Sequence, residues 1–298
     1  MNQHALFDDL LDKLSRELVP LPDKPEETPE STLRALWMLV AGEPMSVASA
    51  MSRELPDLDS RQQEDLKKTI QRRLDGVPLA HISGRQSFMG MELLAGPEAL
   101  IPRKETELLA ASAIDILRRR DDEGEVKVID VCTGAGNVAL AIAKAVQHAR
   151  VYASDLSEEA VGLARMNTEM HDLSDRVALY AGDLLEPFRN LGLRGRVDMI
   201  TCNPPYISSA KVPAMASEIS EHEPEMAFNG GVFGINLMRR LIAEAPEFIR
   251  SGGHLVFEVG LGQGPAMRKQ VEKLPDYGQV RAVEDAHGDA RVIVARLH

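Results

Sequence analysis

The residues best suited to chemistry are Asn203-Pro204-Pro205-Tyr206, which follow an apolar run, 197–202, that reads as a buried strand. Two successive prolines cannot continue a sheet ladder, and they fix the backbone just past the strand. The Asn side chain and the proline carbonyls then form a rigid group of hydrogen-bond acceptors beside an aromatic ring. Such a group suits a planar NH2, which donates two hydrogen bonds while a ring packs over its flat face. An ordinary strand-ending turn is the alternative, because Asn and Pro are common in turns.

A glycine loop follows an earlier apolar strand, 126–131, and opens a helix. Asp130 lies near the end of that strand, and Thr133, Gly134 and Gly136 lie in the loop. Glycines let the backbone turn sharply and approach a ligand closely, while the start of a helix supplies free N–H groups. The third glycine of the dinucleotide fingerprint and the Walker lysine are both absent from this loop. A lone Gly-x-Gly is weak evidence, since tight strand-to-helix turns use it for structure alone.

Two more carboxylates follow the next two predicted strands. Asp155 comes after 150–154 and can accept both hydroxyls of a ribose, although it can also simply cap the helix that opens at Ser157. Asp183 follows 177–180 and can reach an adenine amino group. Parallel strands end at one edge of a sheet, where open α/β sheets bind ligands. The residues that we expect to bind a nucleoside-containing cofactor are Asp130, Thr133, Gly134, Gly136, Asp155, Asp183 and Asn203.

Residues 1–84 read as helical and contain no convincing strand. A stretch rich in Pro and Glu, 20–29, predicts a solvated loop. Apolar spacing predicts helices over 8–18, 47–55 and 60–74. Ser31 or Thr32 is expected to cap a further helix, which Gly42 and Pro44 end. We expect these helices to bury Trp37 and the leucines against one another as a small domain.

From residue 126 onward strands alternate with helices, which implies a parallel sheet covered on both faces. The predicted strands are 126–131, 150–154, 177–180, 197–202, 253–259, 279–284 and 291–297, the last two forming an antiparallel hairpin. The predicted helices are 138–146, 158–170, 235–249 and 263–274. We therefore predict an α/β fold with a seven-stranded, Rossmann-like sheet. The predicted domains are a helical bundle over 1–84, a connector with a β-hairpin over 85–109, and a catalytic domain over 110–298.

Composition limits the classes of protein that fit. With 44% hydrophobic and 27% charged residues, the chain reads as soluble and globular. No apolar segment approaches the roughly 20 residues that span a bilayer, and the acidic first residues do not resemble a secretory signal, so we expect a cytoplasmic protein. A net charge of −12 argues against a broad nucleic-acid face, although a local basic patch stays possible. Cys132 and Cys202 are expected to be small buried residues, and with no His or Cys cluster beside them no metal site is predicted.

The order of these residues resembles the S-adenosylmethionine-dependent methyltransferases that modify exocyclic or amide nitrogens. Within that group the chain resembles the protein N5-glutamine methyltransferase family, which methylates release factors and a ribosomal protein. Three longer motifs carry this resemblance: Arg72–Gly84, Leu100–Glu107 and His222–Glu225. Together they are more specific than the Asn-Pro-Pro-Tyr tetrapeptide, which amino-directed DNA methyltransferases share.

The chain also departs from the family pattern. Lys104-Glu105 replaces the usual Pro-Asp, and 232–234 reads Val-Phe-Gly where many members have Asp-Gly. Cys132-Thr133-Gly134 is more similar to the ribosomal-protein branch, whereas Arg72–Gly84 and 261–264 are more similar to the release-factor branch. These departures leave the family expectation in place and weaken the choice of substrate.

The resemblance implies a class I methyltransferase sheet, S-adenosyl-L-methionine as cofactor and a glutamine amide as methyl acceptor. The implied substrate is the Gly-Gly-Gln segment of a peptide-chain release factor, with a ribosomal protein or an amino group of a nucleic-acid base as alternatives. Asn203 Oδ1 and the Pro204 carbonyl would accept the two N–H bonds of the acceptor, Pro205 would keep the turn rigid, and Tyr206 would pack on the amide. Residues 1–84 would dock the protein substrate. We expect a monomer that binds neither membrane nor nucleic acid directly.

Four further residues are candidates for the wall of the acceptor pocket. Phe88 could wall off the cofactor, or be a core residue of the hairpin. For Arg103 and Glu107 the resemblance suggests a place in the pocket wall, whereas their spacing equally fits a plain surface ion pair. Glu258, flanked by apolar residues, could be a pocket residue or a satisfied core carboxylate. The polar loop 208–225 is expected to order only with substrate, with His222 orienting it.

Overall fold

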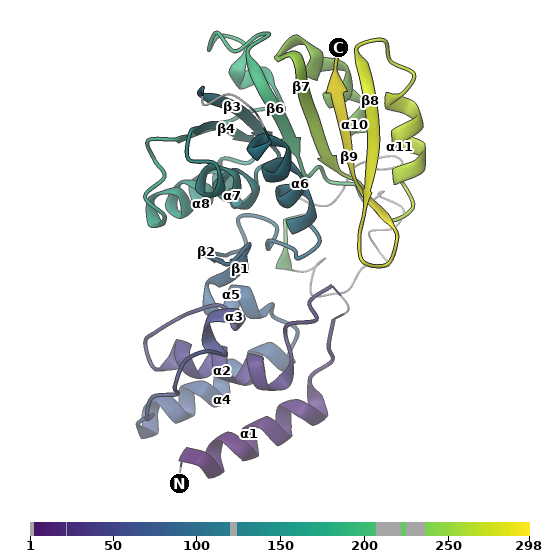
Figure 1. Cartoon of the computed structure of the whole chain (residues 1–298). Coiled ribbons are helices and arrows are strands. Elements are labelled where there is room, and N and C mark those ends of the chain that lie inside the picture. Colours follow the sequence, from purple (N-terminus) through teal and green to yellow (C-terminus); the bar gives the residue numbers. More distant parts are fainter. Residues whose placement is uncertain (1–2, 22, 120–123, 207–221, 225–235) are drawn as a thin grey trace. The chain divides into compact units, whose positions relative to one another are not determined.

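The computed structural model describes residues 3–21, 23–119, 124–206, 222–224 and 236–298. The described residues form two compact units (Figure 1). The first unit holds the chain as far as Pro97, then Ile101–Lys104, and a later segment that ends at Glu223. The second unit holds the remaining described residues. None of the described helices combines the length and the apolar character that a membrane span requires.

The first unit is built from helices around one apolar core. Trp37, Leu14, Leu33, Leu66 and Ile70 are almost fully buried in it, which confirms the prediction that Trp37 and the leucines pack together. The Trp37 indole N–H donates to the Pro56 carbonyl at 2.8 Å, so its one polar atom is satisfied inside the core. The helices are α1 (Gln3–Glu17), α2 (Pro29–Val40), α3 (Val47–Ala50), α4 (Ser60–Leu74) and α5 (Leu79–Ser83).

Capping explains where two of these helices begin. The Thr28 hydroxyl accepts from Ser31 N at the start of α2, whose first residue is Pro29. Asp59 and Gln62 form a reciprocal capping box at the start of α4. Helix α4 begins where the sequence predicts, whereas the predicted cap of α2, Ser31 or Thr32, is wrong because both residues lie inside the helix that Thr28 caps.

Three helical predictions in this unit need correction. Helix α1 begins five residues earlier than predicted. The predicted helix 47–55 stops at Ala50, and the Arg34 side chain binds the carbonyls of Ala50 and Arg53 beyond its last turn. Helix α5 was not predicted, since it spans only five residues between Pro78 and Gly84.

A two-stranded antiparallel hairpin completes the first unit. It pairs β1 (Arg85–Phe88) with β2 (Met91–Leu94). The two turn residues, Met89 and Gly90, both have positive φ (50° and 73°), which is the backbone of the tight turns favoured in hairpins. The hairpin lies inside the connector that the sequence predicts.

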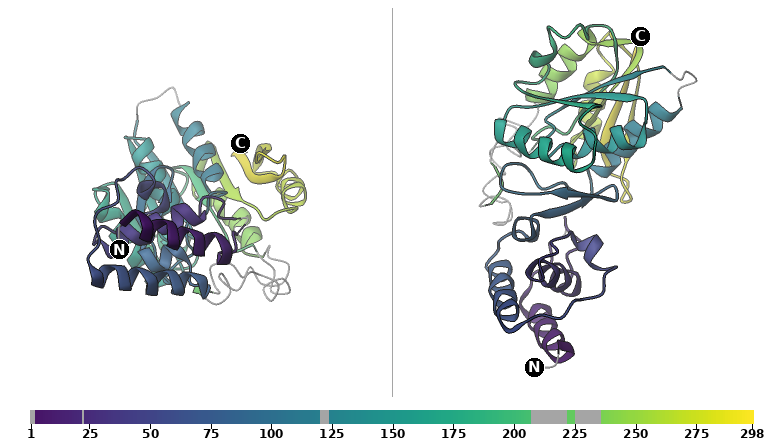
Figure 2. Two further views of the ribbon diagram at one scale, coloured as in Figure 1. Left: turned by 90° about the horizontal axis from the view of Figure 1, so that it is seen from below. Right: turned by 90° about the vertical axis from the view of Figure 1, so that its left-hand side faces the viewer.

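The second unit is a seven-stranded sheet with helices on both faces (Figures 1 and 2). The strands are β3 (Val126–Val131), β4 (Ala149–Asp155), β5 (Val177–Ala181), β6 (Val197–Cys202), β7 (Ile249–Glu258), β8 (Tyr277–Glu284) and β9 (Ala290–Leu297). Their order is β5-β4-β3-β6-β7-β9-β8, and they all run in the same direction except β9, which is antiparallel to both of its neighbours, β7 and β8. The predicted seven-stranded sheet and its closing antiparallel hairpin are both confirmed.

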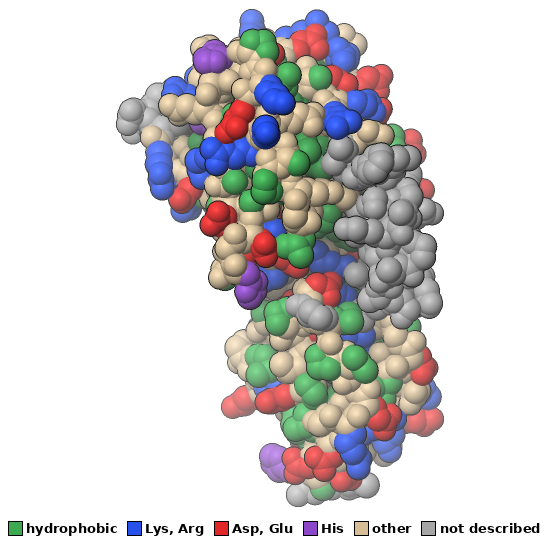
Figure 3. Space-filling model, turned by 90° about the vertical axis from the view of Figure 1, so that its right-hand side faces the viewer, with side chains coloured by type: hydrophobic (Ala, Val, Ile, Leu, Met, Phe, Trp, Pro, Cys, Tyr) green, Lys and Arg blue, Asp and Glu red, His purple; other side chains and the backbone are tan. Residues whose placement is uncertain are grey.

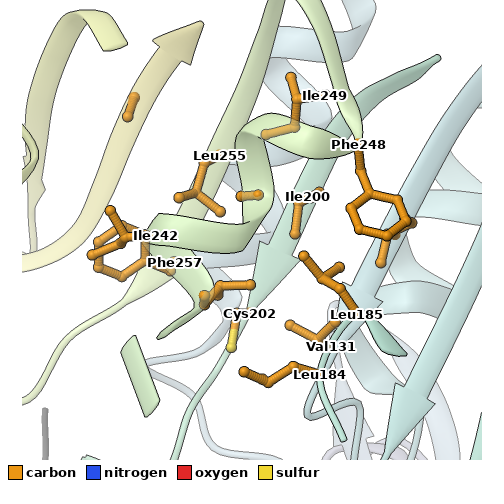
Figure 4. Packing of buried hydrophobic residues seen from close by; sticks show 14 of the residues in the cluster. Val131, Leu184, Leu185, Ile200, Cys202, Ile242, Phe248, Ile249, Leu255 and Phe257 are labelled. Atoms are coloured by element: carbon orange, nitrogen blue, oxygen red, sulfur yellow. The ribbon is translucent and has the colours of Figure 1, made fainter. Parts of the chain in front are cut away.

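The helices and short 3-10 turns of this unit are α6 (Glu107–Arg118), α7 (Asn137–Ala145), α8 (Glu158–Met170), η1 (Glu186–Phe188), α10 (Asn236–Glu244), η5 (Ala245–Glu247) and α11 (Gly264–Val271). Apolar side chains of α10 and α11 pack against one face of the sheet. Figure 4 shows the buried side chains that fill this layer, among them Ile200, Leu255 and Phe257. Helix α7 packs on β4 and against α6, which lies along β6, β7 and β9.

Two predictions in the second unit are wrong. The predicted helix 235–249 ends at Glu244, because Pro246 lacks an N–H and its ring crowds the preceding turn, so a short 3-10 turn follows. Strand β7 then begins at Ile249, four residues before the prediction, with an irregular register beside β6. Helix α6 was not predicted, and it begins inside the predicted connector.

Candidate active site

Four parallel strands end at one edge of the sheet. In register, Val131 pairs with Ser154 on one side and with Cys202 on the other, and Asp155 pairs with Ala181. The residues that follow these strand ends therefore lie at the same edge. They include Gly134, Asp155, Asp183 and Asn203, which the sequence proposes for one site.

The glycine loop after β3 needs the backbone freedom that glycine has. Gly134 and Gly136 have φ values of +53° and +84°, and Gly136 is the N-cap of α7. A Cβ on Gly136 would lie 3.2 Å from the Cβ of Ala164 in α8. Cys202 is buried as predicted, whereas the prediction is wrong for Cys132, which is half-buried because it begins the loop with φ 57°.

The Asp130 carboxylate is buried beneath this loop. Its Oδ2 accepts from the Thr133 hydroxyl and its Oδ1 from the Thr201 hydroxyl, each at 2.6 Å. Burial raises the Asp130 pKa to about 6, although both hydroxyls favour the charged form. Asp130 thus joins the glycine loop to β6. Nothing local in the sequence marks Thr201 for this role, because it lies inside an apolar strand.

Asp155 accepts hydrogen bonds from two backbone N–H groups, one in the glycine loop after β3 and one at the start of α8. Its Oδ2 accepts from Gly134 N at 2.8 Å and its Oδ1 from Ser157 N at 3.1 Å. Burial raises its pKa, and these backbone hydrogen bonds oppose that rise. The Ser157 hydroxyl itself caps α8 by accepting from Ala160 N. Each Asp155 oxygen keeps lone pairs for further donors, such as the hydroxyls of a ribose.

Asp183 lies on the tight turn after β5. Gly182 N donates to the Asp155 carbonyl at 2.8 Å, which ties this turn to the end of β4. A Cβ on Gly182 would lie 2.5 Å from the Pro187 ring, so the turn accepts only glycine there. The half-exposed Asp183 side chain forms an ion pair with Arg240 at 2.9 Å.

The 203–206 segment is held by side chains from distant parts of the unit. Asn203 Nδ2 donates to the Thr106 hydroxyl at 3.1 Å, which leaves Asn203 Oδ1 turned away from Thr106 as an acceptor. The Tyr206 hydroxyl donates to Glu258 Oε1 and Gln263 Nε2 donates to the Tyr206 carbonyl, each at 3.1 Å. The segment is therefore fixed at its first and last residues. The sequence alone does not point to Thr106 or Gln263, since their partners are 97 and 57 residues away.

Tyr206 packs tightly at the end of this segment. A Cβ on Gly260 would lie 2.9 Å from its ring, so only glycine fits at that position of the β7–α11 turn. Burial raises the Tyr206 pKa far above its ordinary value, and the charge of Glu258 raises it further. Tyr206 therefore stays protonated and serves as a hydrogen-bond donor.

Glu258 is almost fully buried at the end of β7, with 1% of its surface exposed. Arg291 Nη2 lies 3.7 Å from its Oε1. Burial raises the Glu258 pKa, while Thr106, Arg291 and Tyr206 lower it. Glu107, another pocket candidate, is the half-buried first residue of α6.

The two remaining pocket candidates belong to the first unit. Phe88 is fully buried at the end of β1. Arg103, with 11% of its side chain exposed, forms an ion pair with Glu223 and lies 3.8 Å from Asp23. Glu223 also accepts from the Ile101 backbone N–H at 2.9 Å, so two of the three family-like motifs meet here. Of the predicted substrate-ordered loop 208–225, all but 222–224 lies outside the described residues, as does 232–234.

Comparison with known proteins gives consistent matches. Residues 110–235 match the family model "Methyltransferase small domain". The release factor glutamine methyltransferase of Gloeobacter violaceus is 36% identical over 78% of this chain and 79% of its own length. The enzyme of the same name from Streptomyces coelicolor is 40% identical over 70% of each chain. In fold, the chain is similar to the hMettl16 catalytic domain, with a TM-score of 0.55 and 15% identity over 77% of this chain and 82% of that one.

These matches bear on three predictions from the sequence. The Rossmann-like methyltransferase fold is confirmed by the sheet order and by the similar solved structure. S-adenosyl-L-methionine as the cofactor is confirmed by the methyltransferase family model and the curated relatives. The identity to those relatives, over more than two thirds of their length, shows that the chain belongs to the release factor glutamine methyltransferase family.

Proposed function

We propose that this chain transfers a methyl group to the side-chain amide nitrogen, N5, of a glutamine in a peptide-chain release factor, at its Gly-Gly-Gln segment. One observation carries this proposal: Asn203 is held by Thr106 with its Oδ1 left as a hydrogen-bond acceptor, at the same sheet edge as the glycine loop and Asp155. The names of the relatives support the choice of a release factor.

The residues of the donor half suit S-adenosylmethionine. Gly134 and Gly136 leave room for close approach of the backbone, and Asp155 would accept the ribose hydroxyls. Asp183 would accept from the adenine amino group, and Asp130 would hold the loop from beneath through Thr133. When bound, the cofactor supplies a methyl group already activated by its positively charged sulfur.

The acceptor half must make an amide nitrogen reactive. That nitrogen is a poor nucleophile, because its lone pair is delocalised into the carbonyl. Asn203 Oδ1 and the Pro204 carbonyl would accept its two N–H bonds, which favours a pyramidal nitrogen and stabilises the positive charge that grows on it. Pro205 keeps the two acceptors at a fixed distance, and alignment of this kind supplies several kcal/mol or more. The methylated nitrogen is acidic, so no strong base is needed to remove its proton.

A protein acceptor fits the charge of the chain. With a net charge of −12, the chain is poorly suited to neutralise phosphates over a broad surface. On the face shown in Figure 3, basic side chains are interspersed with acidic ones. We infer that residues 1–84 dock the release factor, that Phe88, Arg103, Glu107 and Glu258 contribute to the acceptor pocket or its support, and that the enzyme acts as a monomer in the cytoplasm.

The deciding experiment uses S-adenosylmethionine with a labelled methyl group. The protein is incubated with purified release factors, ribosomal proteins, RNA and DNA in separate reactions, and the label is located by mass spectrometry. We expect label on the glutamine of a release-factor Gly-Gly-Gln segment. Label on a ribosomal protein alone would overturn the choice of substrate, and label on nucleic acid alone would overturn the chemistry.

A further inference from the structure

The Asp183 carboxylate, which the proposed function assigns to the adenine amino group, is held by an arginine. Arg240 Nη2 donates to Asp183 Oδ2 at 2.9 Å. Among the residues that the structure describes, Arg240 is the one side chain that binds this carboxylate. A carboxylate has two accepting oxygens. With Oδ2 bound to Arg240, Oδ1 is left to accept from another donor.

The backbone around Asp183 is fixed on both sides. Gly182 N donates to the Asp155 carbonyl at 2.8 Å. The buried Ser154 hydroxyl donates to the Leu184 carbonyl, also at 2.8 Å. Leu184 has a φ of 49°, a left-handed conformation that is unfavourable for leucine and that persists only where surrounding contacts hold it. The turn is therefore rigid, and the side-chain torsions of Asp183 are what a neighbouring residue can set.

Arg240 reaches Asp183 from a helix that shares a core with this turn. Arg240 lies on α10, and buried residues of α10 such as Ile242 belong to the same apolar cluster as Leu184 and Leu185. Figure 4 shows these three side chains in the cluster. Close packing of a core fixes the separation of the elements that share it. Both ends of the ion pair therefore start from backbones that are held in place.

Arg240 also belongs to a wider set of ion pairs. Its Nη2 lies 3.8 Å from Glu244 Oε1, and the further pairs of the set have N–O distances of 2.9 to 3.6 Å. The members alternate in sign along a chain of contacts: Asp183, Arg240, Glu244, Arg189, Glu247 and Arg194. A single exposed ion pair contributes little, whereas charges in a network hold one another in position. The Arg240 guanidinium thus has carboxylates on two elements, which restricts where it can move.

We propose that Arg240 is a positioning residue for the cofactor: by holding Asp183 Oδ2, it turns Oδ1 toward the amino group of adenine. The proposal rests on the part of the proposed function in which Asp183 accepts from that amino group. Arg240 acts through Asp183 and does not have to touch the cofactor. A carboxylate that is already fixed loses less side-chain freedom on binding, so it is a stronger acceptor for adenine.

The proposal predicts a preference for adenine that calorimetry can measure. One ligand is S-adenosylhomocysteine, and the other is its purine analogue, which has hydrogen in place of the adenine amino group. The ratio of the two Kd values isolates the contact to the amino group, because the rest of the ligand is the same. For a hydrogen bond to a charged acceptor, the wild type should bind the adenine ligand about 10- to 100-fold more tightly. Asp183→Ala should remove this preference.

The central variant is Arg240→Met, which keeps an unbranched side chain of good helix propensity and removes the guanidinium. We expect the Kd for S-adenosylhomocysteine to rise about two- to fivefold, the scale of an exposed ion pair, while the Kd for the purine analogue stays unchanged. Arg240→Lys keeps a cationic donor and should keep most of the preference. In an Asp183→Ala background, Arg240→Met should change neither Kd, because the residue it acts through is gone.

Arg194→Met is the matched control. It removes the same charge from the same set of ion pairs, but Arg194 binds Glu247, at 2.9 Å, instead of Asp183. This variant should keep the wild-type preference for adenine. If it lowered the preference as much as Arg240→Met does, the loss of charge alone would explain the result and the positioning role would fail. A merely structural role for Arg240 would lower stability in urea and leave the ratio of the two Kd values unchanged.

The possible results separate this proposal from the proposed function. If Arg240→Met kept the preference in full, the positioning role would be wrong and Asp183 would keep its adenine role. If the wild type bound both ligands equally, the adenine role of Asp183 and the positioning role would both be wrong. Neither measurement involves a methyl acceptor, so transfer to a glutamine is tested independently.

Discussion

The two halves of the proposed reactive edge, the donor half that would bind the cofactor and the acceptor half that would bind the glutamine amide, are built in different ways. In the donor half, glycine backbone and short-range contacts dominate: Asp155 binds Gly134 N and Ser157 N, which lie 21 and two residues away. In the acceptor half, side chains bind side chains across the whole unit: Asn203 binds Thr106, and Tyr206 binds Glu258, over 97 and 52 residues. Asp130 joins the halves, since it binds the loop through Thr133 and β6 through Thr201.

This difference indicates which substitutions should affect each half. The donor half depends on residues that can be seen together in a short stretch of sequence. The acceptor half depends on the completed fold, so a change at a distant residue such as Thr106 reaches it directly. Substitutions should therefore separate cofactor affinity from transfer rate.

The largest expected effect comes from Asn203→Ala. Losing the acceptor for a charge that develops in the transition state should lower kcat by about 100- to 1,000-fold. Cofactor affinity, measured by calorimetry, should stay nearly unchanged, because in the proposed function Asn203 serves mainly the acceptor half. An equal loss of affinity and rate would show that the two halves are not separable at this residue.

Asp130→Asn tests the carboxylate that connects the glycine loop to β6. A folded-state pKa of about 6, against 3.8 for the unfolded chain, means that the folded protein holds this proton more tightly. The contribution of Asp130 to the free energy of unfolding is therefore largest at low pH and falls by about 3 kcal/mol as pH rises from about 4 to about 7. The variant lacks this fall, so its stability relative to wild type should increase over the same range in urea unfolding. Parallel pH dependence in the two proteins would contradict the assignment.

Asp155→Ala should act on the donor half alone. Removing a carboxylate that accepts charge-assisted hydrogen bonds should raise the cofactor Kd by about 10- to 100-fold, with kcat at saturating cofactor little changed. Ser157→Ala is the matched control, because it removes the cap of α8 and leaves the carboxylate in place. A fall in saturated kcat for Asp155→Ala would place this residue in the acceptor half as well.

The smallest effect is expected for Tyr206→Phe. Loss of one neutral donor to Glu258 corresponds to about 1 kcal/mol, or a fall of about fivefold in kcat. Tyr277→Phe removes another buried hydroxyl, which donates to the Ile242 carbonyl at 2.8 Å in a part of the unit remote from Asn203 in sequence. This control should lose stability without losing rate. Equal rates for Tyr206→Phe and wild type would remove Tyr206 from the support of the segment.

The sheet could be predicted from the sequence, whereas the contacts that hold Asn203 and Tyr206 could not. Strands are visible as apolar runs, and Gly134, Gly136 and Asp155 stand directly after two of them. Helix α6 was missed although its buried residues, such as Leu109, Ala113 and Leu117, recur at helical spacing. The predicted helix 235–249 extends past Pro246, although a proline at that position ends α10 at Glu244.

The supports of the acceptor half could not be predicted, for a physical reason. Thr106 precedes a helix that the sequence analysis does not predict, and only the fold shows that its hydroxyl accepts from Asn203. Gly260 reads as a turn glycine, and its need for glycine comes from the Tyr206 ring. Contacts that cross 50 or more residues leave no trace in local spacing.

The ion pair between Arg103 and Glu223 limits how the first unit can be transplanted. Glu223 binds both Arg103 and the Ile101 N–H, although it comes 120 residues after Arg103. Consider a chimera that takes the N-terminal stretch, including Arg103, from one relative and the rest of the chain, including Glu223, from another. Its Arg103 and Glu223 would come from different proteins, so their ion pair could be lost. Removing one partner of a buried pair commonly costs about 3–5 kcal/mol. A stable chimera should therefore exchange the Glu223 segment together with the N-terminal stretch.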